Sequence, residues 1–142
     1  MKTFALILAA TLLTTASAQE SPTKGELDAP ANKVKELQLE RINTLKRLAD
    51  TGLKLAQTGR FEIREAAQAR MTLLKAELEV AEKDSERIEL YTQAVESLKQ
   101  FEAMAKAAKE AARASEFDRL EIVTRRLEVE IWLEQAKSKA GK

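Results

Sequence analysis

Apolar residues recur three and four positions apart along most of this chain, a spacing that places side chains on one face of an α-helix. The clearest run follows Gly59 and consists of Ile63, Ala67, Met71, Leu74, Leu78 and Ala81. The 142 residues include only 4 Gly and 2 Pro, so few positions interrupt a helix. The pattern therefore predicts an all-α protein.

Breaks in the apolar pattern divide the chain into helices. The first helical segment starts after Asn32, a suitable N-cap, and should stop at Gly59, because Gly readily adopts the left-handed conformation that ends many helices. Residues 83–85 can end the second helix and cap the third. Ser115 and Asp118 have the spacing of a capping box and would open a fourth helix. Gly59 and Ser115 are thus the predicted helix-turn positions.

The last helical segment is apolar on two sides. One row consists of Phe117, Leu120, Thr124, Leu127 and Ile131, and the other of Ile122, Val129, Leu133 and Ala136. A helix with two apolar sides suits a central or oligomer-facing position. We take Ile122, Val129, Trp132 and Leu133 as the candidate interaction face. Trp132 either anchors a partner or packs between helices, and we favour packing because aromatic residues are only 4% of the chain.

The chain also resembles itself after a shift of 53 residues. The shift places Gly59 on Ala112, Glu65 on Asp118, Leu74 on Leu127 and Leu78 on Ile131. We interpret this as a duplication of a helix-turn-helix unit, with units at about 33–83 and 86–137. Two antiparallel hairpins would then form an elongated four-helix bundle or coiled coil. Because the second turn has Ala112 in place of Gly, the alternative is three helices, with residues 86–139 as one long helix.

The N-terminal segment has the form of an export signal. A basic Lys2 precedes an apolar run over residues 4–13, and Ala-Ser-Ala at 16–18 matches the small-x-small pattern that signal peptidase accepts. The run is about half as long as a membrane span requires. We predict a signal peptide at 1–18, a flexible leader at 19–32 that holds both prolines, and a helical domain at 33–139. The product is expected to be periplasmic or secreted, without a strong membrane anchor.

Composition excludes several classes of chemistry. The chain contains no Cys and no His, which removes thiolate nucleophiles, histidine bases and the usual zinc and di-iron ligands. Its 24 basic and 23 acidic residues are interspersed, and so provide no basic patch for nucleic acid. We therefore predict a protein that is not an enzyme and that has no cofactor, no metal site and no nucleic-acid partner.

Charged residues have the spacing of ordinary solvated helix faces. Glu79 with Lys83, Glu102 with Lys106, and Glu121 with Arg125 are predicted as pairs between residues four apart, each contributing a few tenths of a kcal/mol. Arg125 and Arg126 have acidic neighbours at positions 121, 128 and 130. We do not interpret these two arginines as a binding patch.

Two segments resemble the helical hairpin of TolC-type outer-membrane efflux proteins. Residues 56–60, followed by 65–70 and 74–78, match its Gly turn, Ala-Gln or Ala-Arg pair and Leu-x-x-Ala-Glu run, and residues 112–134 are similar. The chain also looks like small secreted proteins of uncharacterised function that carry this repeat. In the efflux family such hairpins form a periplasmic tunnel, and the turn region meets the helical hairpin of an adaptor protein.

This sequence departs from the efflux family in two ways. It has no Gly-punctuated alternating strands, and its second turn lacks the Gly. We therefore expect the coiled-coil part used alone, as a non-enzymatic structural or protein-interaction module of the cell envelope. It would act through self-association or a protein partner. The alternative is a periplasmic helical chaperone or apolar-ligand carrier, which would use an exposed concave face or the bundle core.

Overall fold

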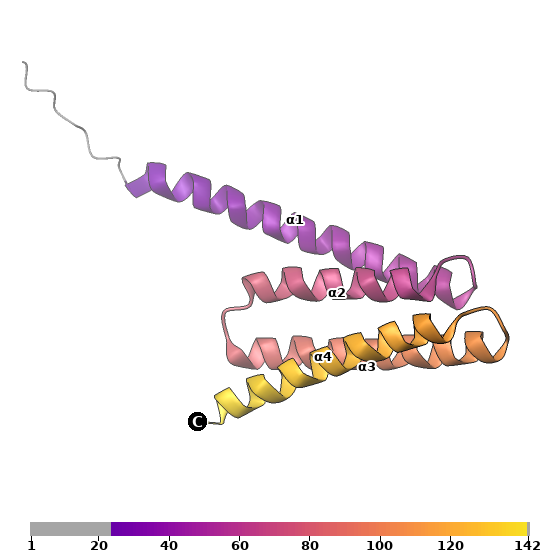
Figure 1. Ribbon diagram of the computed structural model, residues 1–142. Coiled ribbons are helices and arrows are strands. Elements are labelled where there is room, and N and C mark those ends of the chain that lie inside the picture. Colours follow the sequence, from indigo (N-terminus) through magenta and orange to yellow (C-terminus); the bar gives the residue numbers. More distant parts are fainter. Residues whose placement is uncertain (1–23, 142) are drawn as a thin grey trace, which may run out of the picture.

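Four α-helices make up the computed structural model, which describes residues 24–141 (Figure 1). They are α1 (Lys24–Gln57), α2 (Ile63–Val80), α3 (Asp84–Glu110) and α4 (Glu116–Ala140). The prediction of an all-α bundle of four helices is confirmed. A turn separates α3 from α4, so the alternative of one long helix over residues 86–139 is wrong.

The helices pair into two antiparallel hairpins. α1 packs on α2 and α3 packs on α4, while α2 joins the hairpins by lying against α3 and, over a smaller region, α4. Both hairpin turns lie at the same end of the molecule (Figure 1). α1 has 34 residues and α2 has 18, so the first half of α1 projects past the end of its hairpin partner.

The first hairpin turn has the hydrogen bonds of a Schellman motif. Gly59 has φ 70°, in the left-handed region that favours glycine. Its N–H donates to the carbonyl of Ala56 (3.0 Å), and the N–H of Arg60 donates to the carbonyl of Leu55 (2.9 Å). These bonds satisfy carbonyl groups that the end of α1 would otherwise leave unpaired.

The second turn repeats this geometry without a glycine. Ala112 has φ 54°. Its N–H donates to the carbonyl of Lys109 (2.8 Å), and the N–H of Arg113 donates to the carbonyl of Ala108 (2.8 Å). Each donor and acceptor lies 53 residues after its counterpart in the first turn. The second hairpin therefore keeps the turn but holds an L-amino acid in a strained backbone conformation.

This strain predicts opposite effects of exchanging Gly and Ala at the two turns. Ala112→Gly should raise the free energy of unfolding by about 1 kcal/mol, and Gly59→Ala should lower it by about 1 kcal/mol. A Cβ at Gly59 would meet no atom within 4 Å, so the cost there is one of backbone conformation alone. Urea denaturation measures both changes. Ala111→Gly is the control, because Ala111 has φ −86° and no strain to relieve; equal destabilisation by both Ala→Gly changes would contradict the account.

Helix boundaries also follow the 53-residue shift. α1 ends at Gln57 and α3 at Glu110, while α2 begins at Ile63 and α4 at Glu116. Each pair of boundaries differs by 53. The two hairpins thus share their turn, the end of their first helix and the start of their second.

Most of the buried apolar side chains form one cluster between α2, α3 and α4. The members are Ala56, Ala66, Ala67, Met71, Leu74, Ala94, Val95, Leu98, Phe101, Ala105, Ile122, Val129 and Leu133. α1 contributes only Ala56 to this list, and it packs on the opposite side of α2, where Ala49 and Leu73 are also buried. The second hairpin and α2 therefore supply most of the core.

The start of α1 differs from the prediction. The helix begins at Lys24, so residues 24–32 are helical and not part of a flexible leader. Glu26, Leu27 and Ala29 are good helix formers, which favours the helix despite Gly25 and Pro30 in the same stretch. The predicted signal peptide at 1–18 and the rest of the leader, at 19–23, lie outside the described residues.

Ion pairs between helices replace two of the three predicted pairs within helices. Glu121 and Arg125 do pair, at 3.3 Å. Glu102 instead accepts from Arg126 of α4 at 2.7 Å. Glu79 contacts Arg41 of α1 at 2.6 Å, because α2 ends at Val80 and the helical spacing that would bring residue 83 to Glu79 is lost.

Candidate functional site

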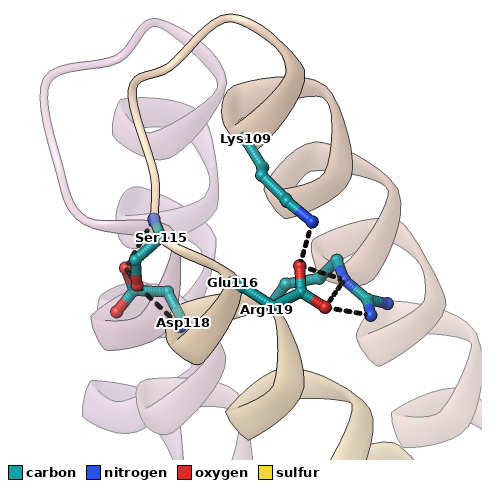
Figure 2. Close-up of polar contacts among 5 residues, drawn as sticks. All are labelled: Lys109, Ser115, Glu116, Asp118 and Arg119. Atoms are coloured by element: carbon teal, nitrogen blue, oxygen red, sulfur yellow. Dashed lines mark hydrogen bonds and ion pairs between the residues drawn. The ribbon is translucent and has the colours of Figure 1, made fainter.

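A polar network secures the turn between α3 and α4 (Figure 2). The side chain of Ser115 accepts from the N–H of Asp118 (3.1 Å), and the Asp118 carboxylate accepts from the N–H of Ser115 (3.1 Å). This reciprocal pair is a capping box at the start of α4. The carboxylate of Glu116 pairs with Arg119 (2.6 Å) on α4 and with Lys109 on α3. Glu116 thus ties the first turn of α4 to the last turn of α3.

Because of these contacts, the free energy of unfolding should fall as the pH is lowered through the acidic range. Hydrogen bonds from Arg119 and then Lys109 lower the pKa of Glu116 from 4.5 to about 2. Hydrogen bonds from Ser115 likewise lower the pKa of Asp118. A carboxylate with a lowered folded-state pKa adds stability above its unfolded pKa, and this is lost as the pH falls. Unfolding followed between pH 4.5 and about 2 should show a smaller loss in Glu116→Gln than in the natural chain.

Salt supplies the control for this pH dependence. The Glu116 side chain is 41% exposed, so added salt should screen its ion pairs and reduce the difference between the two chains. Identical acid profiles for Glu116→Gln and the natural chain at low salt would contradict the assigned role of Glu116.

A cleft of about 420 Å³ lies where the two hairpin turns meet. The buried side chains of Ala56, Ala105 and Ile122 contribute to its lining. Arg64 and Asp118 also line it, one from α2 and one from α4. The cleft joins both repeats and combines an apolar surface with charged groups. It could accommodate a small apolar ligand or one side chain of a partner protein.

One row of α4 lies in the core. Ile122 and Val129 have no exposed surface, and Leu133 is buried. Trp132 is half-buried, with its ring centroid 6.2 Å from that of Tyr91 on α3. Three of the four positions of the predicted interaction face therefore pack inside the chain, while Trp132 keeps part of its surface exposed and lines a surface depression. The spacing of apolar residues identified the row of Ile122, Val129 and Leu133, and the packing of α4 on α3 places this row in the core.

The opposite row of α4 is open to solvent. We name Leu120, Leu127 and Ile131 the α4 outer stripe; they recur at helical spacing and are 46% to 56% exposed. Phe117 extends the row toward the turn and is 66% exposed. Two shallow depressions run along the stripe, both lined by Leu127 and Ile131. α4 thus has a second apolar face that the rest of the described chain leaves uncovered.

A similar row lies on α1. We name Val34, Leu37, Leu48 and Leu55 the α1 outer stripe; they are 36% to 55% exposed, and their spacings place them on one side of the helix. Leu39 is also exposed but points to the other side. The 53-residue shift is the sequence signal that distinguishes the two sides, because it places Leu48 on the buried Phe101 and Leu39 on the exposed Thr92.

Within residues 24–141, no group of three or more Asp or Glu side chains is placed to hold a metal ion. No helix in the same range combines the length and apolar character that crossing a bilayer requires. Comparison with known proteins found no matching family model, no matching curated protein and no matching solved structure.

Proposed function

We propose that this chain is a non-enzymatic, exported structural or protein-interaction module of the cell envelope, and that it binds protein through the α4 outer stripe. The observation that carries the proposal is the double-sided character of α4. Ile122 and Val129 fill the core, while Leu127 and Ile131 on the opposite side remain exposed. An apolar row of this kind beside polar residues is typical of helix-mediated protein recognition.

Two features of the sequence support the envelope as the location. Residues 1–18 have the form of an export signal. The hairpin around Gly59 resembles that of TolC-type efflux proteins, in which hairpins of this type serve in the periplasm. The turn end of the bundle is a second place at which a protein partner could bind.

Recovery of partners from the native envelope tests the proposal. The full chain would carry a C-terminal tag and be cross-linked in its own host before purification. We expect a bound protein to be recovered with the natural sequence and with Leu39→Gln. A second copy of this chain counts as such a protein. Leu127→Gln should lose it. Leu39 and Leu127 are 50% and 46% exposed, so they form a matched pair. Equal recovery with all three chains, or none with any, would overturn the proposal.

The cleft between the turns favours a second candidate function, that of a carrier of apolar ligands or a chaperone. An apolar dye should then bind the folded protein saturably. Ala108→Phe should reduce that binding several-fold, because Ala108 lines the cleft and a phenyl ring there would fill it. Ala103→Phe is the control, since Ala103 is an exposed position of α3 away from the cleft. Dye titration by fluorescence measures the effect; unchanged affinity in Ala108→Phe would exclude the cleft as the site.

A further inference from the structure

The chain contains one example of how its hairpins pack together. The first hairpin meets the second where α2 lies against α3. Ala67, Met71 and Leu74 of α2 share a buried cluster with Leu98 and Phe101 of α3. All five side chains are at most 3% exposed. This is a well-packed contact between one copy of the repeat and the next.

Both surfaces of that contact recur, uncovered, on the two outer helices. The 53-residue shift carries the α2 surface onto α4, where Leu74 corresponds to Leu127 and Leu78 to Ile131. The reverse shift carries the α3 surface onto α1, where Phe101 corresponds to Leu48. Phe101 is 2% exposed, whereas Leu48 is 53% exposed. The α4 outer stripe is therefore the counterpart of a surface that the chain buries between its own hairpins, and so is Leu48 of the α1 outer stripe.

We propose that α4 of one copy packs on α1 of a second copy, as α2 packs on α3 within the chain. This inference rests on the proposed function and names its partner. The contact joins two different surfaces, so it is head-to-tail and leaves an open stripe at each end of a dimer. Repetition adds hairpins in the same up-and-down order and keeps every turn at one end. The assembly closes into a ring or grows as a filament.

The short connection between α2 and α3 sets the register of this contact. It spans only residues 81–83, and in an antiparallel pair joined so closely we expect positions equally distant from residue 82 to come opposite each other. This rule pairs Leu74 of the buried cluster with Leu90, which packs against the same cluster. The 53-residue shift converts this pair into Leu127 of one copy and Leu37 of the next. Leu37 lies in the first half of α1 and is 52% exposed, so it is accessible to a second copy.

The same register brings opposite charges together at the end of the contact. Ile131 comes to lie near Val34 of the next copy. Glu134 is one turn beyond Ile131 on α4, and Lys33 adjoins Val34 on α1. Both charged side chains are exposed, and each pairs within its own helix, Lys33 with Glu36 and Glu134 with Lys137. The matching of the apolar rows therefore favours a single register.

Disulfide trapping tests the proposal sharply, because the chain has no cysteine of its own. The full chain would be prepared as Leu37→Cys, as Leu127→Cys and as the double variant, and then oxidised with copper phenanthroline. We expect an equimolar mixture of the two single variants to give a disulfide-linked dimer and the double variant to give a ladder of multimers. Leu39→Cys replaces Leu37→Cys as the control and should give no dimer with Leu127→Cys, since residue 39 faces away from the α1 outer stripe.

Other outcomes of the trapping experiment would overturn the inference. A strong disulfide dimer from Leu127→Cys alone would show a two-fold α4 to α4 contact instead of a head-to-tail one. Absence of any trapped species would show that the stripes do not meet. If an envelope protein other than this chain is still recovered in a way that depends on Leu127, the proposed function stands while this inference fails. If nothing is recovered, both fail.

Discussion

Leu74→Ala is expected to lower the free energy of unfolding by about 2–5 kcal/mol, whereas Leu127→Ala changes it by no more than about 0.5 kcal/mol at low protein concentration. The two residues occupy the same position in the two repeats. Leu74 has no exposed surface, so its truncation removes burial and leaves a cavity. Leu127 is 46% exposed, so its truncation removes little buried surface from the monomer.

Denaturant unfolding followed by circular dichroism measures this contrast. Protein concentration separates folding from assembly. The natural chain should become more stable as its concentration rises, because association favours the folded state. Leu127→Ala should lose that dependence, and Leu74→Ala should not lose it under conditions where it remains folded. Similar losses of stability in both variants at low concentration would contradict the distinction between inner and outer faces.

The second large effect concerns the ion pair between α3 and α4. Arg126 bonds Glu102 at 2.7 Å, and the two side chains are only 19% and 27% exposed. The equivalent positions in the first hairpin hold Leu73 and Ala49, both buried. The repeat thus fills one structural position with an apolar pair in one hairpin and an ion pair in the other.

Arg126→Leu alone should cost about 2 kcal/mol, because it leaves the partly buried carboxylates of Glu102 and Glu130 without their shared partner. The double variant Glu102→Ala with Arg126→Leu should recover to within about 1 kcal/mol of the natural chain, since it copies the apolar pair of the first hairpin and leaves only Glu130 without its partner. A double-mutant cycle by urea denaturation measures the coupling. A double variant as unstable as Arg126→Leu would show that the second hairpin cannot accept the first hairpin's packing.

Most helix ends could be predicted from the sequence, because the residues next to them determine where a helix starts and stops. Gly59 indicated the first turn, and Ser115 with Asp118 indicated the start of α4. The conformation of Ala112 had no local signal, since alanine disfavours a positive φ. The early start of α1 was missed because Gly25 and Pro30 outweighed the good helix formers around them in the prediction.

The faces of α4 show why the candidate site was harder to predict than the fold. Both rows of α4 have helical spacing and similar apolar content, so periodicity cannot tell which row is buried. The choice depends on how α4 meets α3, and pairs such as Glu102 with Arg126 reflect an interhelical register that is not encoded locally. The internal repeat carries that information, because the buried row of α2 predicts which row of α4 resembles an interface.

Sedimentation of two complementary variants tests most directly the claim that α4 and α1 carry matching outer surfaces. Leu127→Gln disables the α4 outer stripe and leaves α1 intact, while Leu48→Gln does the reverse. We expect each variant alone to sediment as a monomer and their equimolar mixture to form a dimer that grows no further. A mixture that stays monomeric at high concentration, or self-association of either variant alone, would contradict the head-to-tail assembly.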